Sequence, residues 1–161
     1  MNEAKKKRQT RDFRDLFDTI EFPQAYQITF LAGSIARPAY DAIYQDLGII
    51  RAEFVLLACL AHFPEMTAQE VARVSQRPRN TVSRAVHRML AEGYIERIPH
   101  LTDGRQSTLK ITPVGQALQR EAAQYLRSRQ EVVLSSLTAD ERQQLSALLR
   151  KTARAVAARD D

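Results

Sequence analysis

The sequence predicts a mainly α-helical chain with one small β-hairpin, organised around a winged helix-turn-helix. Three observations support this fold class. Apolar residues recur at helical spacing along most of the 161 residues, and the chain holds only 5 glycines and 6 prolines. Two short helical segments follow each other closely in the middle of the chain. A pair of strand-like segments with an Asp-Gly turn signal comes directly after them.

Composition is ordinary for a folded protein, with 44% hydrophobic and 27% charged residues. The single cysteine, Cys59, excludes an intrachain disulfide and is typical of a reducing compartment. The most apolar stretch, residues 54–61, is much shorter than the roughly 20 residues that span a bilayer. The basic run at residues 5–8 is not followed by an apolar segment, unlike a secretory signal. We therefore expect a cytoplasmic protein without a membrane segment.

The first third of the chain is predicted to form an arm and two helices. Residues 1–20 are polar and rich in charge, so we interpret them as a basic N-terminal arm with a short helix near residues 13–17. Apolar residues at three- and four-residue spacing predict a helix over residues 24–45. Pro38 lies inside this helix and predicts a kink or a restart. A second helix is expected over residues 51–62.

The middle of the chain carries the helix-turn-helix signals. Thr67 and Glu70 have the spacing of a capping box, which predicts a short helix to about residue 74. A turn at residues 75–77 follows. Pro78 suits the first turn of the next helix, which we expect to end near Gly93.

The hairpin and two more helices complete the chain. Residues 95–98 and 107–112 are strand-like and are separated by a loop. Thr112 is a suitable cap for a long helix that begins at Pro113. Thr138 and Glu141 repeat the capping-box spacing and predict a last helix to about residue 157.

Charge is unevenly distributed along the chain, although the net charge is only +5. Residues 67–112 hold eight Lys and Arg against four acids, and residues 1–14 hold six against two. Residues 15–66 instead hold two against seven. A local basic block is typical of a surface that binds a polyanion, and a solvated helix that carries arginines is the alternative. We expect the acidic stretch to lie mostly away from the polyanion.

The helix at residues 78–92 has two distinct sides at 100° per residue. The apolar side carries Val82, Ala85, Val86, Met89 and Leu90, whereas the opposite side carries Arg77, Asn80, Arg84, His87 and Arg88. No acid occurs between Val71 and Ala91. Arg and Asn are the side chains that read guanine and adenine in the DNA major groove, and further cations bind phosphates. We predict base contacts by Asn80, Ser83 and Arg84, with His87 on the same face, and phosphate contacts by Arg77, Arg79 and Arg88.

The predicted hairpin tip carries Asp103, Gly104 and Arg105. Glycine permits the turn, and Arg105 is a candidate for the minor groove, where the negative potential is high. An ordinary turn without a DNA contact is the alternative.

The residues of the helix-turn-helix and the hairpin resemble those of a known family. The stretch from Thr67 to Gly115 resembles the MarR family of bacterial transcription regulators. The resemblance covers the segment from Asn80 to Leu90, then Glu92, Gly93 and Tyr94. Its most specific part is Asp103 and Arg105 followed by Leu109, Ile111, Thr112 and Gly115. The turn at residues 75–77 departs from the family because it lacks the usual glycine.

The resemblance implies a homodimer that binds a pseudo-palindromic operator in double-stranded DNA. The helices of residues 21–48 and 113–158 would intertwine to form the dimer, and residues 51–112 would form the winged helix-turn-helix. Many such proteins are repressors that small aromatic or phenolic ligands release, whereas others sense oxidants or zinc.

The sequence says less about the signal to which such a regulator would respond than about DNA binding. Cys59 has no Lys or Arg close by in the chain, so it resembles a small buried residue more than a reactive thiol. No spacing of metal ligands is evident, and we expect neither a metal nor a cofactor. An organic effector remains, with Arg51 as a partner for a carboxylate and Tyr26, Phe30, Tyr40, Tyr44, Phe54 and His62 as walls. Filling of the core and the dimer interface is the alternative for each of them.

The sequence thus predicts a dimeric, sequence-specific DNA-binding regulator, a repressor that a small aromatic or carboxylate effector relieves. An enzyme is not expected, because no Gly-rich phosphate loop, paired catalytic carboxylates or nucleophile elbow is found. The alternatives are a non-specific architectural DNA binder, a redox-responsive regulator that uses Cys59, and a winged helix that binds protein.

Overall fold

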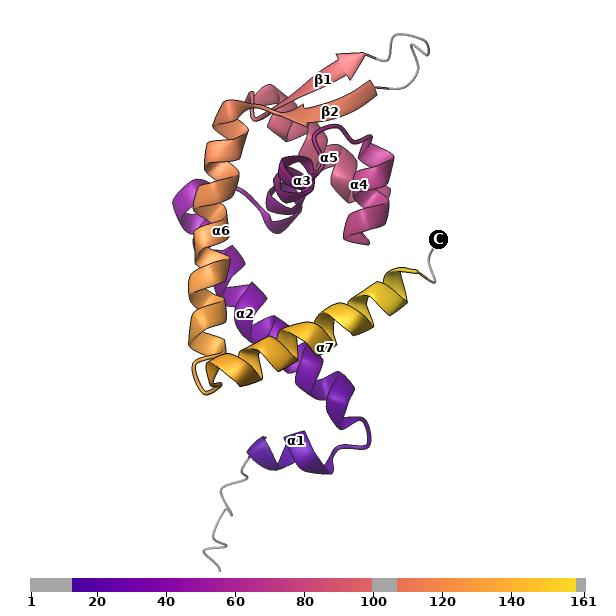
Figure 1. Cartoon of the computed structure of the whole chain (residues 1–161). Helices are drawn as coiled ribbons and strands as arrows, with labels where there is room; N and C mark the ends of the chain where they lie inside the picture. The colour runs from indigo at the N-terminus through magenta and orange to yellow at the C-terminus, as the bar shows by residue number, and fades with distance from the viewer. Residues whose placement is uncertain (1–12, 100–106, 159–161) are drawn as a thin grey trace, which may run out of the picture. The chain divides into compact units, whose positions relative to one another are not determined.

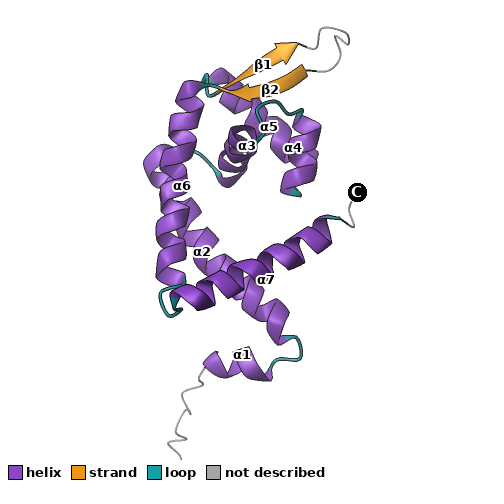
Figure 2. Cartoon of the chain, in the orientation of Figure 1, coloured by secondary structure: helices purple, strands orange, loops and turns teal. Residues whose placement is uncertain are grey.

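The computed structural model describes residues 13–99 and 107–158, and it confirms a mainly helical chain with one hairpin (Figures 1 and 2). The elements are η1 (Phe13–Asp15), α1 (Leu16–Thr19), α2 (Pro23–Leu47), α3 (Arg51–His62), α4 (Ala68–Ser75), α5 (Arg79–Ala91), β1 (Ile95–Pro99), β2 (Ser107–Ile111), α6 (Pro113–Val133) and α7 (Ala139–Ala157). The chain divides after Ser34 into two compact units.

The first unit is held by aromatic side chains. The ring of Phe17 in α1 lies 5.7 Å from that of Tyr26 and 5.0 Å from that of Phe30, both in α2. The side-chain amide of Gln27 donates a hydrogen bond of 2.9 Å to the carbonyl of Phe17. These contacts fix the short α1 against the beginning of α2, since a helix of four residues has little stability of its own.

Pro38 does not restart the helix, because α2 runs through it to Leu47. Proline has no N–H to donate to the carbonyl four residues before it, which belongs to Ser34. The division between the two compact units falls directly after this same residue. The expected restart is therefore wrong, and the expected kink at Pro38, which lies inside the second unit, stays a prediction.

The second unit is built around α3, which packs against α4, α5, α6 and β2 (Figure 1). The apolar side chains at its centre are fully buried and come from five parts of the fold. They are Ile43, Leu56, Leu57, Leu60, Val71, Met89 and Leu109. This shared core fixes the helix-turn-helix and the hairpin on one support.

The hairpin pairs β1 and β2 in antiparallel register, with Ile95 opposite Ile111 and Arg97 opposite Leu109. The backbone of Met66 also exchanges two hydrogen bonds with that of Leu109, of 2.7 and 3.3 Å. The segment before α4 thereby lies beside the hairpin, a pairing that the sequence did not predict.

The hairpin begins and ends at one tight junction. Gly93 ends α5 with a φ of +72°, a left-handed conformation that favours glycine. The Thr112 hydroxyl donates to the Gly93 carbonyl at 2.9 Å and accepts a hydrogen bond from the Gly115 N–H at 3.1 Å. A Cβ on Gly115 would collide with the backbone carbonyl of Tyr94. The ends of α5 and β2 and the first turn of α6 therefore meet with no space for a further atom.

We expect Gly115→Ala to lower the free energy of unfolding by about 2–3 kcal/mol, because the new methyl group must displace backbone. Urea denaturation at a fixed protein concentration measures this change. Gly33→Ala in α2 is the matched control, since nothing lies within 4 Å of the added methyl group. The control should gain about 0.5–1 kcal/mol from helix propensity. Equal stability of Gly115→Ala and the unmodified chain would contradict the close contact.

Candidate nucleic-acid interface

The two sides of α5 lie as the sequence predicts, except that Arg88 reaches Glu53 of α3. Its apolar side chains, Val82, Ala85, Val86 and Met89, are buried against the core. Asn80, Ser83, Arg84 and His87 are exposed on the other side. The buried stripe fixes the rotation of the helix about its axis, and so it determines which polar side chains face outward.

The helix before it, α4, is fixed at its start by the predicted capping box. The Thr67 hydroxyl accepts from the Glu70 N–H at 3.2 Å, and the Glu70 carboxylate accepts from the Thr67 N–H at 2.7 Å. The hydrogen bond from the backbone of Thr67, followed by that from its hydroxyl, lowers the pKa of Glu70 below its ordinary value. The carboxylate therefore stays ionised at neutral pH, near the positive end of the α4 dipole.

The turn between α4 and α5 uses an unusual residue. Gln76 has a φ of +52° and ψ of 37°, which is the left-handed conformation that glycine usually supplies. Its N–H bonds to the carbonyl of Arg73 at 3.2 Å, and the N–H of Arg77 bonds to that of Ala72 at 3.1 Å. The helix-turn-helix thus keeps a tight turn without glycine.

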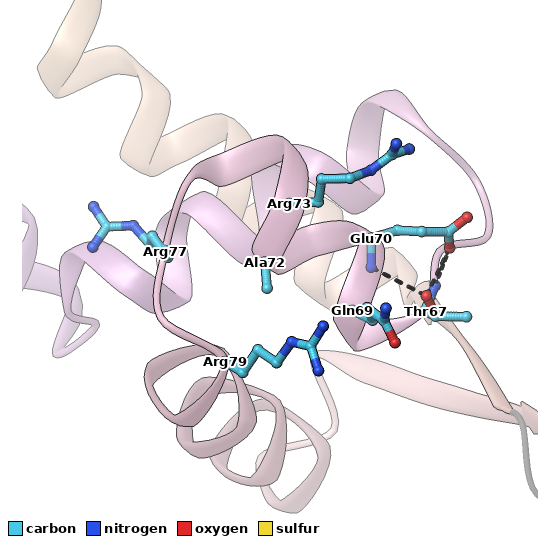
Figure 3. A pocket seen from close by; sticks show the side chains of 7 residues that line it. All are labelled: Thr67, Gln69, Glu70, Ala72, Arg73, Arg77 and Arg79. Carbon is cyan, nitrogen blue, oxygen red and sulfur yellow. Dashed lines mark hydrogen bonds between the residues drawn. The ribbon is translucent and has the colours of Figure 1, made fainter. Parts of the chain in front are cut away.

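A basic hollow of about 580 Å³ lies where the turn joins the two helices (Figure 3). Its walls carry three arginines and the capping box, and they are Thr67, Gln69, Glu70, Ala72, Arg73, Arg77 and Arg79. Figure 3 shows Arg79 reaching from the start of α5 toward Gln69, whereas Arg73 and Arg77 extend in other directions. Arg73 was not among the predicted contacts, although it lies in the acid-free stretch that predicted them.

The two arginines further along α5 differ in their partners. Arg84 is exposed and donates to the backbone carbonyl of Asn80 at 3.4 Å, within its own helix. Arg88 instead reaches Glu53 of α3, with Nη1 at 3.1 Å from Oε1 and 3.0 Å from Oε2. The sequence did not predict this pair, because the two residues are far apart in the chain.

The strands of the predicted wing present polar side chains of both signs. Arg97 on β1 donates to the Ser107 hydroxyl of β2 at 3.4 Å, and Glu96 lies opposite Lys110. The predicted tip residues Asp103, Gly104 and Arg105 lie outside the described residues, so their expected role remains a prediction.

The residues proposed for an effector occupy different parts of the fold. Tyr26 and Phe30 belong to the aromatic cluster of the first unit. In the second unit, Phe54 is a core residue whose ring contacts Tyr40 at 5.9 Å, and the guanidinium of Arg51 lies 5.0 Å above the Tyr40 ring. Tyr44 is exposed on α2. The ring of His62 lies 4.6 Å from that of Phe63.

A second hollow of about 420 Å³ lies between α2 and α6, and the predicted effector residues are not among those that line it. Its walls are Pro38, Ala39, Ala42, Glu121, Gln124, Tyr125, Ser128, Arg129 and Val132. The Tyr125 hydroxyl donates to the Asp46 carboxylate at 2.8 Å, and this bond raises the pKa of Tyr125. The hydrogen bond ties α6 to the end of α2.

Cys59 is half-buried in α3, and burial raises the pKa of its thiol. A raised pKa leaves less thiolate at neutral pH, and the thiolate is the form that reacts with oxidants. Within residues 13–99 and 107–158, no group of three or more His, Cys, Asp or Glu residues is placed to hold a metal ion. In the same part of the chain, no helix is both long and apolar enough to span a membrane.

Comparison with known proteins gives consistent matches. The family model described as MarR family matches residues 47–106. The multiple antibiotic resistance protein MarR of Salmonella typhimurium is 32% identical over 108 residues, which are 65% of this chain and 74% of that protein. An HTH-type transcriptional repressor of Mycobacterium tuberculosis is 26% identical over 124 residues, 77% of this chain and 89% of the repressor.

Solved structures agree with these matches. Apo MarR from E. coli has a TM-score of 0.69 and 25% identity, covering 81% of this chain and 96% of its own. A cysteine-to-serine variant of E. coli MarR, solved in complex with operator DNA, shares the fold with a TM-score of 0.69, 24% identity and coverage of 88% and 99%.

The left-handed Gln76 provides a test of the turn. We expect Gln76→Gly to raise the free energy of unfolding by about 0.5–1 kcal/mol. Glycine removes a left-handed penalty of about 1–2 kcal/mol and loses part of this gain through its larger unfolded-state entropy. Thermal and urea denaturation measure the difference.

Gln69→Gly is the matched control, because it makes the same exchange at an exposed position inside α4. It should destabilise the protein by about 1 kcal/mol, since its backbone is helical. Destabilisation by both variants would show that Gln76 is not strained.

Proposed function

Because the chain belongs to the MarR family of transcription regulators, we propose that it is a homodimeric repressor that binds a pseudo-palindromic DNA operator through α5 and the wing. The observation that carries this proposal is the exposed side of α5. It presents Asn80, Ser83 and Arg84 opposite a buried apolar stripe, with no acid between Val71 and Ala91. The fold is also shared with a MarR variant that was solved on operator DNA.

The roles of the side chains follow from their chemistry. Asn80 and Arg84 carry the bidentate donors and acceptors that distinguish adenine and guanine in the major groove, and Ser83 and His87 share their face. Arg77 and Arg79 contact phosphates from the basic hollow, and Arg73 adds a third cation on α4. Arg105 enters the minor groove from the wing.

Dimerisation is supported by α7, which buries none of its residues within a single chain. Leu148 and Leu149 are 63% and 51% exposed, and Val156 is also exposed. A helix of 19 residues with an uncovered apolar stripe requires a partner surface in water, and a second copy of the chain supplies it.

Release by a small aromatic or carboxylate effector completes the proposal and is supported by the family resemblance. In vitro selection from random duplex DNA, followed by footprinting, identifies the operator. Repeating the footprint with a panel of aromatic carboxylates tests the effector. Equal affinity for the selected and a scrambled duplex would contradict sequence-specific binding and favour the architectural alternative.

Loss of a base contact lowers sequence preference, whereas loss of a phosphate contact lowers the affinity for all sequences. We expect Arg84→Ala to reduce the preference for operator over scrambled DNA by about 1–3 kcal/mol per half-site. Arg79→Ala should instead weaken binding to both duplexes alike. It should also flatten the plot of log K against log salt by about 0.9 for each phosphate that the variant no longer neutralises. Fluorescence anisotropy on both duplexes over a range of salt gives both quantities, and a uniform loss with Arg84→Ala would contradict its role as a base contact.

The dimer has an independent test. Sedimentation of the unmodified chain at micromolar concentration should give twice the chain mass of 18.3 kDa. The double variant Leu148→Asp/Leu149→Asp should shift the equilibrium toward monomer, because association would bury two carboxylates. Gln143→Asp, on the other side of α7, is the control and should remain dimeric. A stable, folded monomer of the unmodified chain would contradict the proposal.

A further inference from the structure

A buried carboxylate of α3 lies on the inner side of α5. Glu53, in the first turn of α3, is only 3% exposed. Its Oε2 atom accepts from the Ile50 N–H at 2.8 Å, which satisfies a free donor at the start of α3. A buried carboxylate also requires a positive partner, since removal from water costs several kcal/mol for an unpaired ion.

Arg88 of α5 is that partner, and its guanidinium binds two groups at once. Nη1 lies 3.0 and 3.1 Å from the two carboxylate oxygens of Glu53. Nη2 donates to the backbone carbonyl of Gly48 at 2.9 Å. Gly48 ends α2 in a left-handed conformation, with a φ of +68°. One side chain of α5 therefore holds the end of α2 and the beginning of α3 together.

The side chain of Arg88 is 44% exposed, so its exposure alone resembles that of a free surface cation. Its hydrogen bonds contradict that interpretation. Swinging the whole guanidinium onto a phosphate would break its bonds to Glu53 and Gly48 and leave the carboxylate buried without a counter-ion, so these bonds hold the charged group on the inner side of α5. The planar fork of arginine can satisfy both partners, whereas the single ammonium of lysine cannot reproduce this geometry.

We infer that Arg88 and Glu53 form a positioning pair that fixes α5 against α3 and the end of α2, and that this pairing, and not the neutralisation of a phosphate, is the main role of Arg88. This inference rests on the proposed function, because it assigns a role within the same DNA-binding surface. The pair acts on operator binding through the placement of Asn80, Ser83 and Arg84, which lie on the same helix.

Operator affinity over a range of salt separates the two roles of Arg88. We compare Arg88→Lys, Arg88→Met and Glu53→Gln with Arg79→Lys and Arg79→Met, which act on an arginine of the basic hollow. All variants are measured at a temperature at which circular dichroism shows them folded. Glu53→Gln is close to isosteric and keeps an acceptor for the Ile50 N–H, so it removes mainly the charge.

For a positioning pair, Arg88→Lys and Glu53→Gln should each weaken operator binding by about tenfold, within the range of coupling between linked sites. The slope of log K against log salt should stay the same in both variants. The double variant Arg88→Lys/Glu53→Gln should bind the operator no more weakly than the weaker of the two single variants. Arg79→Lys should keep the salt slope of the unmodified protein, because it keeps the cation, whereas the slope of Arg79→Met should fall by about 0.9 for each phosphate that it no longer neutralises. A near-normal Arg88→Lys, a reduced slope for Arg88→Met and an unaffected Glu53→Gln would overturn the inference and return Arg88 to the phosphate contacts.

A second measurement does not depend on the operator. Hydrogen–deuterium exchange of the free protein should be faster in the amides of residues 48–54 and 82–92 in Glu53→Gln than in the unmodified chain. The same amides should be unchanged in Arg79→Met. Unchanged exchange in Glu53→Gln would overturn the positioning role, whether or not the protein binds an operator. Lack of preference for an operator would instead contradict the proposed function.

Discussion

The burial of one carboxylate, that of Glu53, constrains the arrangement of three helices. The charge cannot remain in the interior without hydrogen bonds and a cation. It obtains the first from the Ile50 N–H at the start of α3 and the second from Arg88 of α5. Because Arg88 also binds the carbonyl of Gly48, the end of α2 is part of the same arrangement. Two contacts thus fix the rotation of α5, and with it the side chains that face outward: the packing of its apolar stripe and the bond from Arg88 to Glu53.

The hairpin follows from the position of α5, because it begins shortly after the end of that helix, at a junction with no free space. Gly93 reverses the chain, Thr112 bonds back to its carbonyl, and Gly115 brings α6 against Tyr94. The wing and the long helix α6 therefore leave this junction in directions that α5 sets. A displacement of α5 near Arg88 would therefore change this junction or move the wing and α6 with it.

The sequence predicted what depends on neighbours in the chain. Both capping boxes, the cap at Thr112 and the two sides of α5 were found, because each depends on spacings of three or four residues. Three features escaped prediction because their partners are distant in sequence or their backbone is unusual: the Arg88–Glu53 pair, the pairing of Met66 with Leu109, and the left-handed Gln76. Residues proposed for an effector were chosen by type, and type alone does not determine which of them meet in space.

Charge along the chain differs from charge in space for the same reason. Glu53 belongs to the acidic stretch of residues 15–66, most of which we expect to lie away from the DNA-binding surface. This one acid of the stretch pairs with an arginine of the basic stretch, on the inner side of α5. The arginines that we propose for DNA contacts then lie near the turn and the start of α5, at Arg77 and Arg79, with Arg84 on the outer face. A count of charges along the chain therefore overestimates the number of unpaired cations on this helix, because it does not show that Arg88 is paired with Glu53.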